Sequence, residues 1–250
     1  MTDLNINCPG LEILKLEDLR LKGLDISGTG LLELQVMGCL RYTSSWAKIL
    51  VPNLQWLYWK DTFNVKCVTD SFEDLNMGTV HFSYLPLSSR NPATLQSAAS
   101  FISALCFARS LNVRSGVLKI LSTMDSEDGL PFCFKNLTTL EIRTHLTKYR
   151  TTRIICLLGS SPILHTISIG VNCSEHVIKS WDDDQYWRSQ SENIKSILHQ
   201  LKVARIDVGG TKMPKSAFHL VEFLLRYETT LQEMTLTLKI DPVGGTRDSF

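Results

Sequence analysis

Three consecutive carboxylates, Asp182 to Asp184, form the densest group of like charges in the chain, within the segment WDDDQYWRSQ (181–190). Carboxylate oxygens are ligands that Ca²⁺ prefers. Adjacent side chains in such a run point apart, however, and no second set of ligands with the spacing of a calcium-binding loop follows. The favoured interpretation is a solvated acidic loop, so no metal site is predicted.

Residue types used in catalysis are scattered along the chain. The six histidines occur at positions 81, 145, 165, 176, 199 and 219. None belongs to an H-E-x-x-H motif, and the sequence contains no G-x-S-x-G, phosphate-binding loop or dinucleotide-binding fingerprint. A catalytic group assembled from distant segments stays open as a minor alternative, but we predict no enzyme, no catalytic residue and no cofactor.

Composition and cysteine usage limit the classes of protein to which this chain can belong. The formal net charge is +1, and no apolar run approaches the roughly 18 residues that a membrane helix needs. We therefore expect neither nucleic acid nor a membrane as partner. The seven cysteines are scattered without a C-x-x-C, and no secretory leader is visible. This pattern predicts reduced thiols and a location in the cytoplasm or nucleus, with Cys8 and Cys39 in structural roles.

A short phrase recurs along the chain: an apolar residue, two variable ones, Leu, one variable residue and another apolar one. Its clean copies are LEILKL (11–16), LLELQV (31–36) and LQWLYW (54–59). A period in the twenties with an L-x-x-L-x-L core is the signature of a leucine-rich repeat. Looser copies continue to the end of the chain: MGTVHF (77–82), ARSLNV (108–113), LTTLEI (137–142), LHTISI (164–169), LKVARI (201–206) and LQEMTL (231–236).

Each copy is expected to form one strand whose alternate side chains face a common interior. The segments between copies lengthen along the chain, and two of them have helical spacing of apolar residues, Pro92 to Ala108 and Met213 to Tyr227. The prediction is an α/β fold, an irregular leucine-rich-repeat solenoid. Its parallel sheet would line the concave face, with helices and loops on the convex face.

The outward positions of the strands would form a partner-binding surface. Trp56 and Tyr58 stand out because exposed aromatic residues flanked by basic ones are frequent at binding centres. The alternative is that these rings cover a neighbouring repeat or a loop. The candidate contact residues are Trp56, Tyr58, Lys60, His81, Arg114, Glu141 and Arg143.

Longer stretches carry a family resemblance. The segments Cys8 to Cys39 and Val51 to Asp61 resemble the repeats of plant F-box/LRR/FBD-type proteins, and Ile197 to Leu238 is similar to their FBD region. The resemblance implies leucine-rich repeats over 1–170, an FBD-like region over 171–240 and a flexible tail over 241–250. In that family an N-terminal F-box docks a Skp-type adaptor of a ubiquitin ligase, and the repeats present a protein substrate.

This chain starts inside a repeat and shows no LP-x-E-(I/V)-L-type F-box helix. The resemblance therefore implies a truncated family member that recognises a protein substrate, and a Skp-type adaptor is not an expected partner. Two alternatives stay open. One is a small-molecule-dependent sensor, whose pocket could draw only on Lys60, Arg114 and Arg143. The other is a non-functional remnant that folds poorly.

Overall fold

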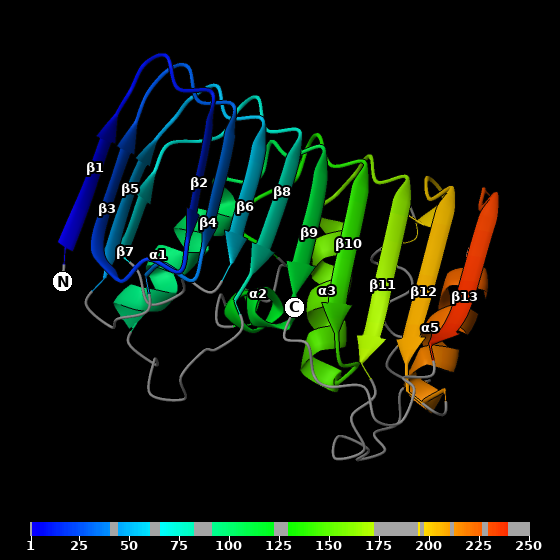
Figure 1. Cartoon of the computed structure of the whole chain (residues 1–250). Coiled ribbons are helices and arrows are strands. Elements are labelled where there is room, and N and C mark those ends of the chain that lie inside the picture. The colour runs from blue at the N-terminus through cyan, green and yellow to red at the C-terminus, as the bar shows by residue number, and fades with distance from the viewer. Residues whose placement is uncertain are drawn as a thin grey trace.

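The computed structural model describes residues 2–40, 45–60, 66–82, 92–122, 130–172, 195, 198–210, 213–226 and 230–239. All strands in these ranges pair in parallel and form two sheets, one of four strands and one of nine. The predicted fold class, an α/β repeat solenoid, is confirmed (Figure 1).

The larger sheet contains one strand from each of the nine predicted copies. In spatial order its strands are β2 (Ile13–Glu17), β4 (Glu33–Met37), β6 (Trp56–Lys60), β8 (Met77–His81), β9 (Ser110–Arg114), β10 (Thr139–Thr144), β11 (Thr166–Asn172), β12 (Val203–Gly209) and β13 (Glu233–Lys239). Sequence order and spatial order agree, so each strand buries its apolar face by stacking on the neighbouring copies.

Backbone hydrogen bonds tie the copies together just before each strand begins. The carbonyl oxygen of Glu12 accepts bonds from the amides of Leu32 (2.8 Å) and Glu33 (3.0 Å). The same paired arrangement joins the later copies up to Lys202, whose carbonyl oxygen accepts from two residues of the last copy. Within the described residues only the junction between β8 and β9 differs. There two neighbouring carbonyl oxygens, those of Leu75 and Asn76, each accept one hydrogen bond, from the amides of Arg109 and Ser110.

The fourth copy lies two residues earlier than the sequence pattern predicted. Leu57 pairs with Gly78 and Trp59 with Val80, so the copy is LNMGTV (75–80). Gly78 occupies a position that holds leucine in most copies. The space is filled from neighbouring turns, because a Cβ atom at Gly78 would lie 3.2 Å from a methyl group of Leu111. A glycine at a core position concealed this repeat from the apolar pattern.

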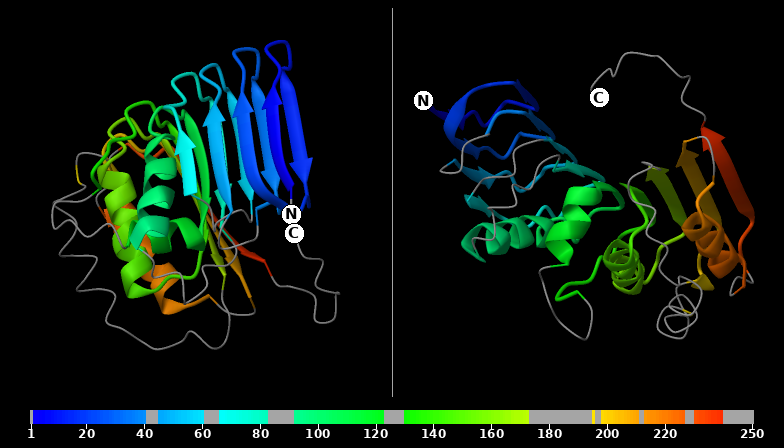
Figure 2. Two further views of the ribbon diagram at one scale, coloured as in Figure 1. Left: turned by 90° about the vertical axis from the view of Figure 1, so that its left-hand side faces the viewer. Right: turned by 90° about the horizontal axis from the view of Figure 1, so that it is seen from below.

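In the first turns the convex side is built from strands, where helices and loops were predicted. The four-stranded sheet consists of β1 (Thr2–Asn7), β3 (Leu21–Ser27), β5 (Trp46–Leu50) and β7 (Lys66–Thr69). Copies that start 20 to 23 residues apart leave too few residues for a helix and two connections. A second strand fits this length, and the two sheets enclose the core between them (Figure 2).

Helices cover the convex side of the later turns. They are α1 (Pro92–Ser103), α2 (Ser115–Leu121), α3 (Lys148–Gly159) and α5 (Lys215–Arg226). The predicted helix from Pro92 is confirmed but ends at Ser103 rather than Ala108. The second predicted helix corresponds to α5, whose buried residues include Leu220 and Leu224.

The change from strands to helices takes place between β7 and α1, which lie side by side. The hydroxyl of Ser97 in α1 accepts a hydrogen bond from the amide of Cys67 (2.6 Å) and donates one to its carbonyl oxygen (3.3 Å). The rings of Trp59 and Phe101 meet beneath this junction, with centroids 5.1 Å apart. The edge of the smaller sheet is therefore joined to the first helix through side-chain contacts as well as packing.

The nine-stranded sheet continues through the expected boundary near residue 170. Residues 166–172 of β11 pair in register with residues 203–209 of β12. The division into repeats and an FBD-like region stays a prediction. The acidic segment 181–190 and the tail 241–250 lie outside the described residues.

The last strand departs from the expected burial. Leu236 and Leu238 point toward the interior side in the repeat pattern, yet they are 45% and 44% exposed. Among the described residues β13 is the edge strand of its sheet and pairs only with β12, so no further copy packs over these leucines.

Candidate functional site

The predicted contact residues all lie on the solvent side of four adjacent strands, β6, β8, β9 and β10. Trp56 is 44% exposed, and Arg143 is also exposed. The other predicted contact residues are half-buried: Tyr58, Lys60, His81, Arg114 and Glu141. Because alternate residues of a strand face the same side, the sequence pattern correctly separated these positions from the core.

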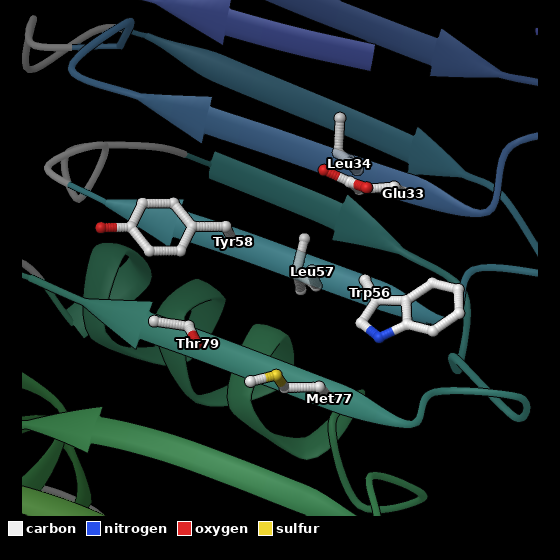
Figure 3. Close-up of a pocket in the computed structure, with 7 residues that line it drawn as sticks. All are labelled: Glu33, Leu34, Trp56, Leu57, Tyr58, Met77 and Thr79. Atoms are coloured by element: carbon white, nitrogen blue, oxygen red, sulfur yellow. The ribbon is translucent and has the colours of Figure 1, made fainter. Parts of the chain in front are cut away.

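A shallow hollow of about 350 Å³ surrounds the two aromatic residues. Its base is the strand surface at Leu34 and Leu57, whose side chains are buried and face the core, and its rim is formed by Glu33, Trp56, Tyr58, Met77 and Thr79. Figure 3 shows Trp56 and Tyr58 at opposite ends of the hollow, with Leu57 between them. The arrangement offers an apolar contact area with one carboxylate at its border.

Met77 is a rim residue for which the sequence pattern gives the wrong side of the sheet. In the predicted fourth copy, MGTVHF (77–82), Met77 is the first residue and would face the interior. In the structure it is 43% exposed and pairs with Trp56 across β6 and β8. The signal that could have placed it correctly is Leu75, two residues earlier, which is buried and begins the true copy. Met77 adds a flexible apolar side chain beside the indole ring.

Basic side chains occupy one row at the carboxyl ends of the same four strands. Lys60 pairs with His81 across β6 and β8, and Arg114 pairs with Arg143 across β9 and β10. The row is continuous, because Val80 and Val113 pair directly before His81 and Arg114.

One cation of this row is neutralised within the chain. The carboxylate of Glu141 accepts hydrogen bonds from Arg143 Nε (2.9 Å) and from Asn112 Nδ2 (2.7 Å). Within the part of the chain that the structure describes, no carboxylate forms an ion pair with Lys60 or Arg114. These two charges are the ones available to a partner.

The charges near the C-terminal end of the sheet are paired with one another. Arg205 contacts Glu233 (3.0 Å), and Lys239 contacts Asp207 (2.8 Å). Both pairs join neighbouring strands on the solvent side. This end of the sheet therefore has less unpaired charge to offer than its centre.

The described residues contain no group of three or more histidine, cysteine or acidic side chains that could hold a metal ion. No helix among them is long and apolar enough to cross a membrane.

The thiols of the repeat turns differ in their surroundings. Burial raises the pKa of the Cys67 thiol to about 12, so it does not become a thiolate at neutral pH. Cys39 is buried and its thiol donates to the carbonyl oxygen of Met37 (3.2 Å), as a structural role requires. Cys8, by contrast, is exposed, which does not agree with the expected packing in a repeat turn.

Comparison with known proteins adds an independent observation. A curated Arabidopsis thaliana protein, assigned by its name to the F-box/FBD/LRR-repeat type, is 28% identical to this chain over 263 aligned positions. The alignment covers 94% of this chain and 50% of the relative. This chain is a relative of a plant F-box/FBD/LRR-repeat protein. The resemblance predicted from the repeats and the C-terminal segment is thereby confirmed.

The match to this F-box/FBD/LRR-repeat relative extends over nearly all of the chain, but the chain spans only about half the length of that relative. No protein-family profile matches the chain, and no solved structure does. The name of the relative is consistent with a role in protein interaction, which agrees with a repeat solenoid that presents aromatic side chains on its sheet.

Proposed function

We propose that this chain is a protein-interaction module that captures a target protein on the solvent side of its nine-stranded sheet, around Trp56 and Tyr58. Its role would be similar to that of the substrate-recognition part of an F-box-type ubiquitin ligase subunit. The observation that carries the proposal is the hollow bordered by the side chains of Trp56, Tyr58 and Met77, of which Trp56 and Met77 are exposed.

The dimensions of the sheet support a protein rather than a small ligand. Nine strands about 4.8 Å apart span roughly 40 Å, which is wide enough for an interface of about 800 Å² on each partner. Tryptophan and tyrosine frequently contribute most of the binding free energy at such interfaces, because they bury a large area with few rotatable bonds.

The alternative function, sensing a small molecule, finds less support at this site. Such a sensor would use a deep pocket ringed by basic side chains. The residues that line the hollow include no lysine or arginine, and Lys60 lies beyond its border. A Skp-type adaptor is not among the proposed partners, and a location in the cytoplasm or nucleus is a further proposal.

The experiment is a pull-down from plant cell extract with a tagged form of the chain, followed by affinity measurement with the protein that co-purifies. We expect Trp56→Ala and Tyr58→Ala each to weaken capture by more than about 1 kcal/mol, or roughly fivefold, without changing the melting temperature. Phe218→Ala is the matched control, because Phe218 is an exposed aromatic residue on α5.

Unchanged affinity in both aromatic variants would remove this surface from consideration. Recovery of a Skp-type adaptor and a cullin together with the target would support coupling to a ubiquitin ligase. An eluate that contains chaperones alone, together with a non-cooperative melting curve, would favour a non-functional remnant instead.

A further inference from the structure

The distribution of charge over the sheet differs from strand to strand. On the solvent side of β6, β8, β9 and β10, the charges are Lys60, Arg114 and Arg143 against Glu141, a net charge of 3 − 1 = +2 with histidine neutral. The whole chain has a net charge of only +1. The positive charge is therefore concentrated beside the hollow.

The flanking strands do not share this excess. On β2 and β4 the outward charges are Lys15 against Glu17 and Glu33, which sum to 1 − 2 = −1. On β12 and β13 two basic and two acidic residues form two ion pairs and cancel. A negatively charged partner would thus be attracted to the centre of the sheet and to neither end.

We infer that the segment captured at the proposed site is an extended acidic stretch of a protein, with a bulky apolar residue next to its acidic residues. This inference rests on the proposed function, because it names the class of partner for the same surface. The apolar residue would enter the hollow between Trp56 and Tyr58. The acidic residues would lie along the basic row, which consists of Lys60, His81, Arg114 and Arg143.

Spacing supports this match. The basic row crosses four neighbouring strands, or three intervals of about 4.8 Å, and so is roughly 14 Å long. In an extended peptide, residues i, i+2 and i+4 face one side and span about 13.5 Å. Acidic residues at alternate positions of such a peptide can therefore reach Lys60 and Arg114, which lie two strand intervals, or roughly 10 Å, apart. Tyr58 precedes Lys60 by two residues on β6, which places the hollow about 7 Å from the end of the row.

Nucleic acid fits this surface less well. A phosphate backbone carries one negative charge per nucleotide and would pass the carboxylates of Glu33 and Glu141, both of which face the same side as the basic row. A peptide can place its acidic residues opposite the cations and neutral residues opposite these carboxylates. The two available cations also form a much smaller patch than nucleic-acid-binding proteins present.

The test uses the full chain and a displayed library of random twelve-residue peptides, selected at low salt. We expect the selected peptides to carry Asp or Glu at alternate positions beside Leu, Phe or Trp. A fluorescent peptide of the selected consensus then serves as probe for anisotropy titration. Selection of neutral or basic peptides, or no enrichment at all, overturns the inference.

Charge-reversal variants test the position of the site. The double variant Lys60→Glu/Arg114→Glu should weaken binding of the peptide at least about tenfold. The matched control is Lys22→Glu/Lys215→Glu, which changes the net charge equally at exposed positions on β3 and α5; it should stay within about twofold. Equal losses in both double variants, or displacement of the peptide by an oligothymidine of the same charge, would contradict the inference.

The two proposals can fail separately. If Trp56→Ala abolishes capture of the target while Lys60→Glu/Arg114→Glu leaves it unchanged, the binding surface stands and its preference for acidic segments is wrong. If neither variant changes capture, both proposals are wrong. Loss of capture in both variants, with Phe218→Ala and the control double variant unaffected, supports both.

Discussion

The early and the late turns of this solenoid contribute to the same concave sheet, but different elements cover its convex side. From β2 to β8, successive strands are joined through the four-stranded sheet on the convex side. From β8 onward, helices α1, α2, α3 and α5 take that place. The difference teaches that the concave surface depends on the short repeated phrase, whereas the length of each connecting segment decides which elements support it.

The two regions bury their cores in different ways. In the early turns Leu34 and Val36 of the larger sheet share one core with Leu24 and Ile49 of the smaller sheet, and all four are nearly inaccessible to solvent. In the late turns the sheet is covered by helical side chains such as Ile154 on α3. The candidate site lies over the transition, where Trp59 of β6 packs on Phe101 of α1 and β8 contacts α2.

The largest effect is expected from opening a cavity in either region. Leu34→Ala and Ile154→Ala should each lower the free energy of unfolding by about 2–5 kcal/mol, because each removes a fully buried side chain. Chemical denaturation measures this change, with Gln35→Ala on the solvent side of β4 as control. A loss confined to one of the two variants would show that the two regions do not unfold as one unit.

Backbone contacts provide a second comparison, with an intermediate effect. A Cβ atom at Gly30 would overlap the carbonyl oxygen of Pro9, and one at Gly116 would overlap that of Phe82. Gly30→Ala in the early turns and Gly116→Ala in the late turns should therefore each cost about 1–3 kcal/mol of stability.

Gly78→Ala is the control for these two variants. Its added methyl group would meet side-chain methyls at 3.2 Å or more, and these can shift. It should change the free energy of unfolding by less than about 1 kcal/mol. Thermal unfolding followed by circular dichroism measures all three, and a Gly78→Ala loss as large as the others would mean that the fourth copy is packed more rigidly than its contacts indicate.

The smallest effect is a pH dependence that belongs to the late turns. Burial, and secondarily the positive charge of Arg150, lower the pKa of His145 below its ordinary value. A histidine whose pKa is lower in the folded state stabilises the fold fully above its unfolded pKa of about 6.5. That stability is lost as the pH falls through this value and levels off below the folded pKa.

We therefore expect the melting temperature to fall between about pH 7.5 and pH 5, and this dependence to be weaker in His145→Gln. The side chain is only partly buried, so the change should be modest. Identical pH profiles for the wild-type chain and His145→Gln would remove His145 as the cause.

The repeated phrase by itself determined much of this protein. Alternation of apolar residues, as in Leu14 and Leu16, fixes which side of each strand faces the interior, because a strand reverses side-chain direction at every residue. The same alternation is enough to place Trp56, Tyr58 and the basic residues on the solvent side. Two helices could be predicted from the sequence because their apolar residues recur at helical spacing.

Other features were decided only by the tertiary structure. The strands β3, β5 and β7 have no distinctive pattern of their own, and they become a sheet because each finds its hydrogen-bond partners in the neighbouring turn. Gly78 is a core residue only because Leu111 and its neighbours fill the space beside it. The hollow and the basic row arise from the same cause: stacking brings together side chains that are 21 to 33 residues apart in the sequence, at distances that no local pattern specifies.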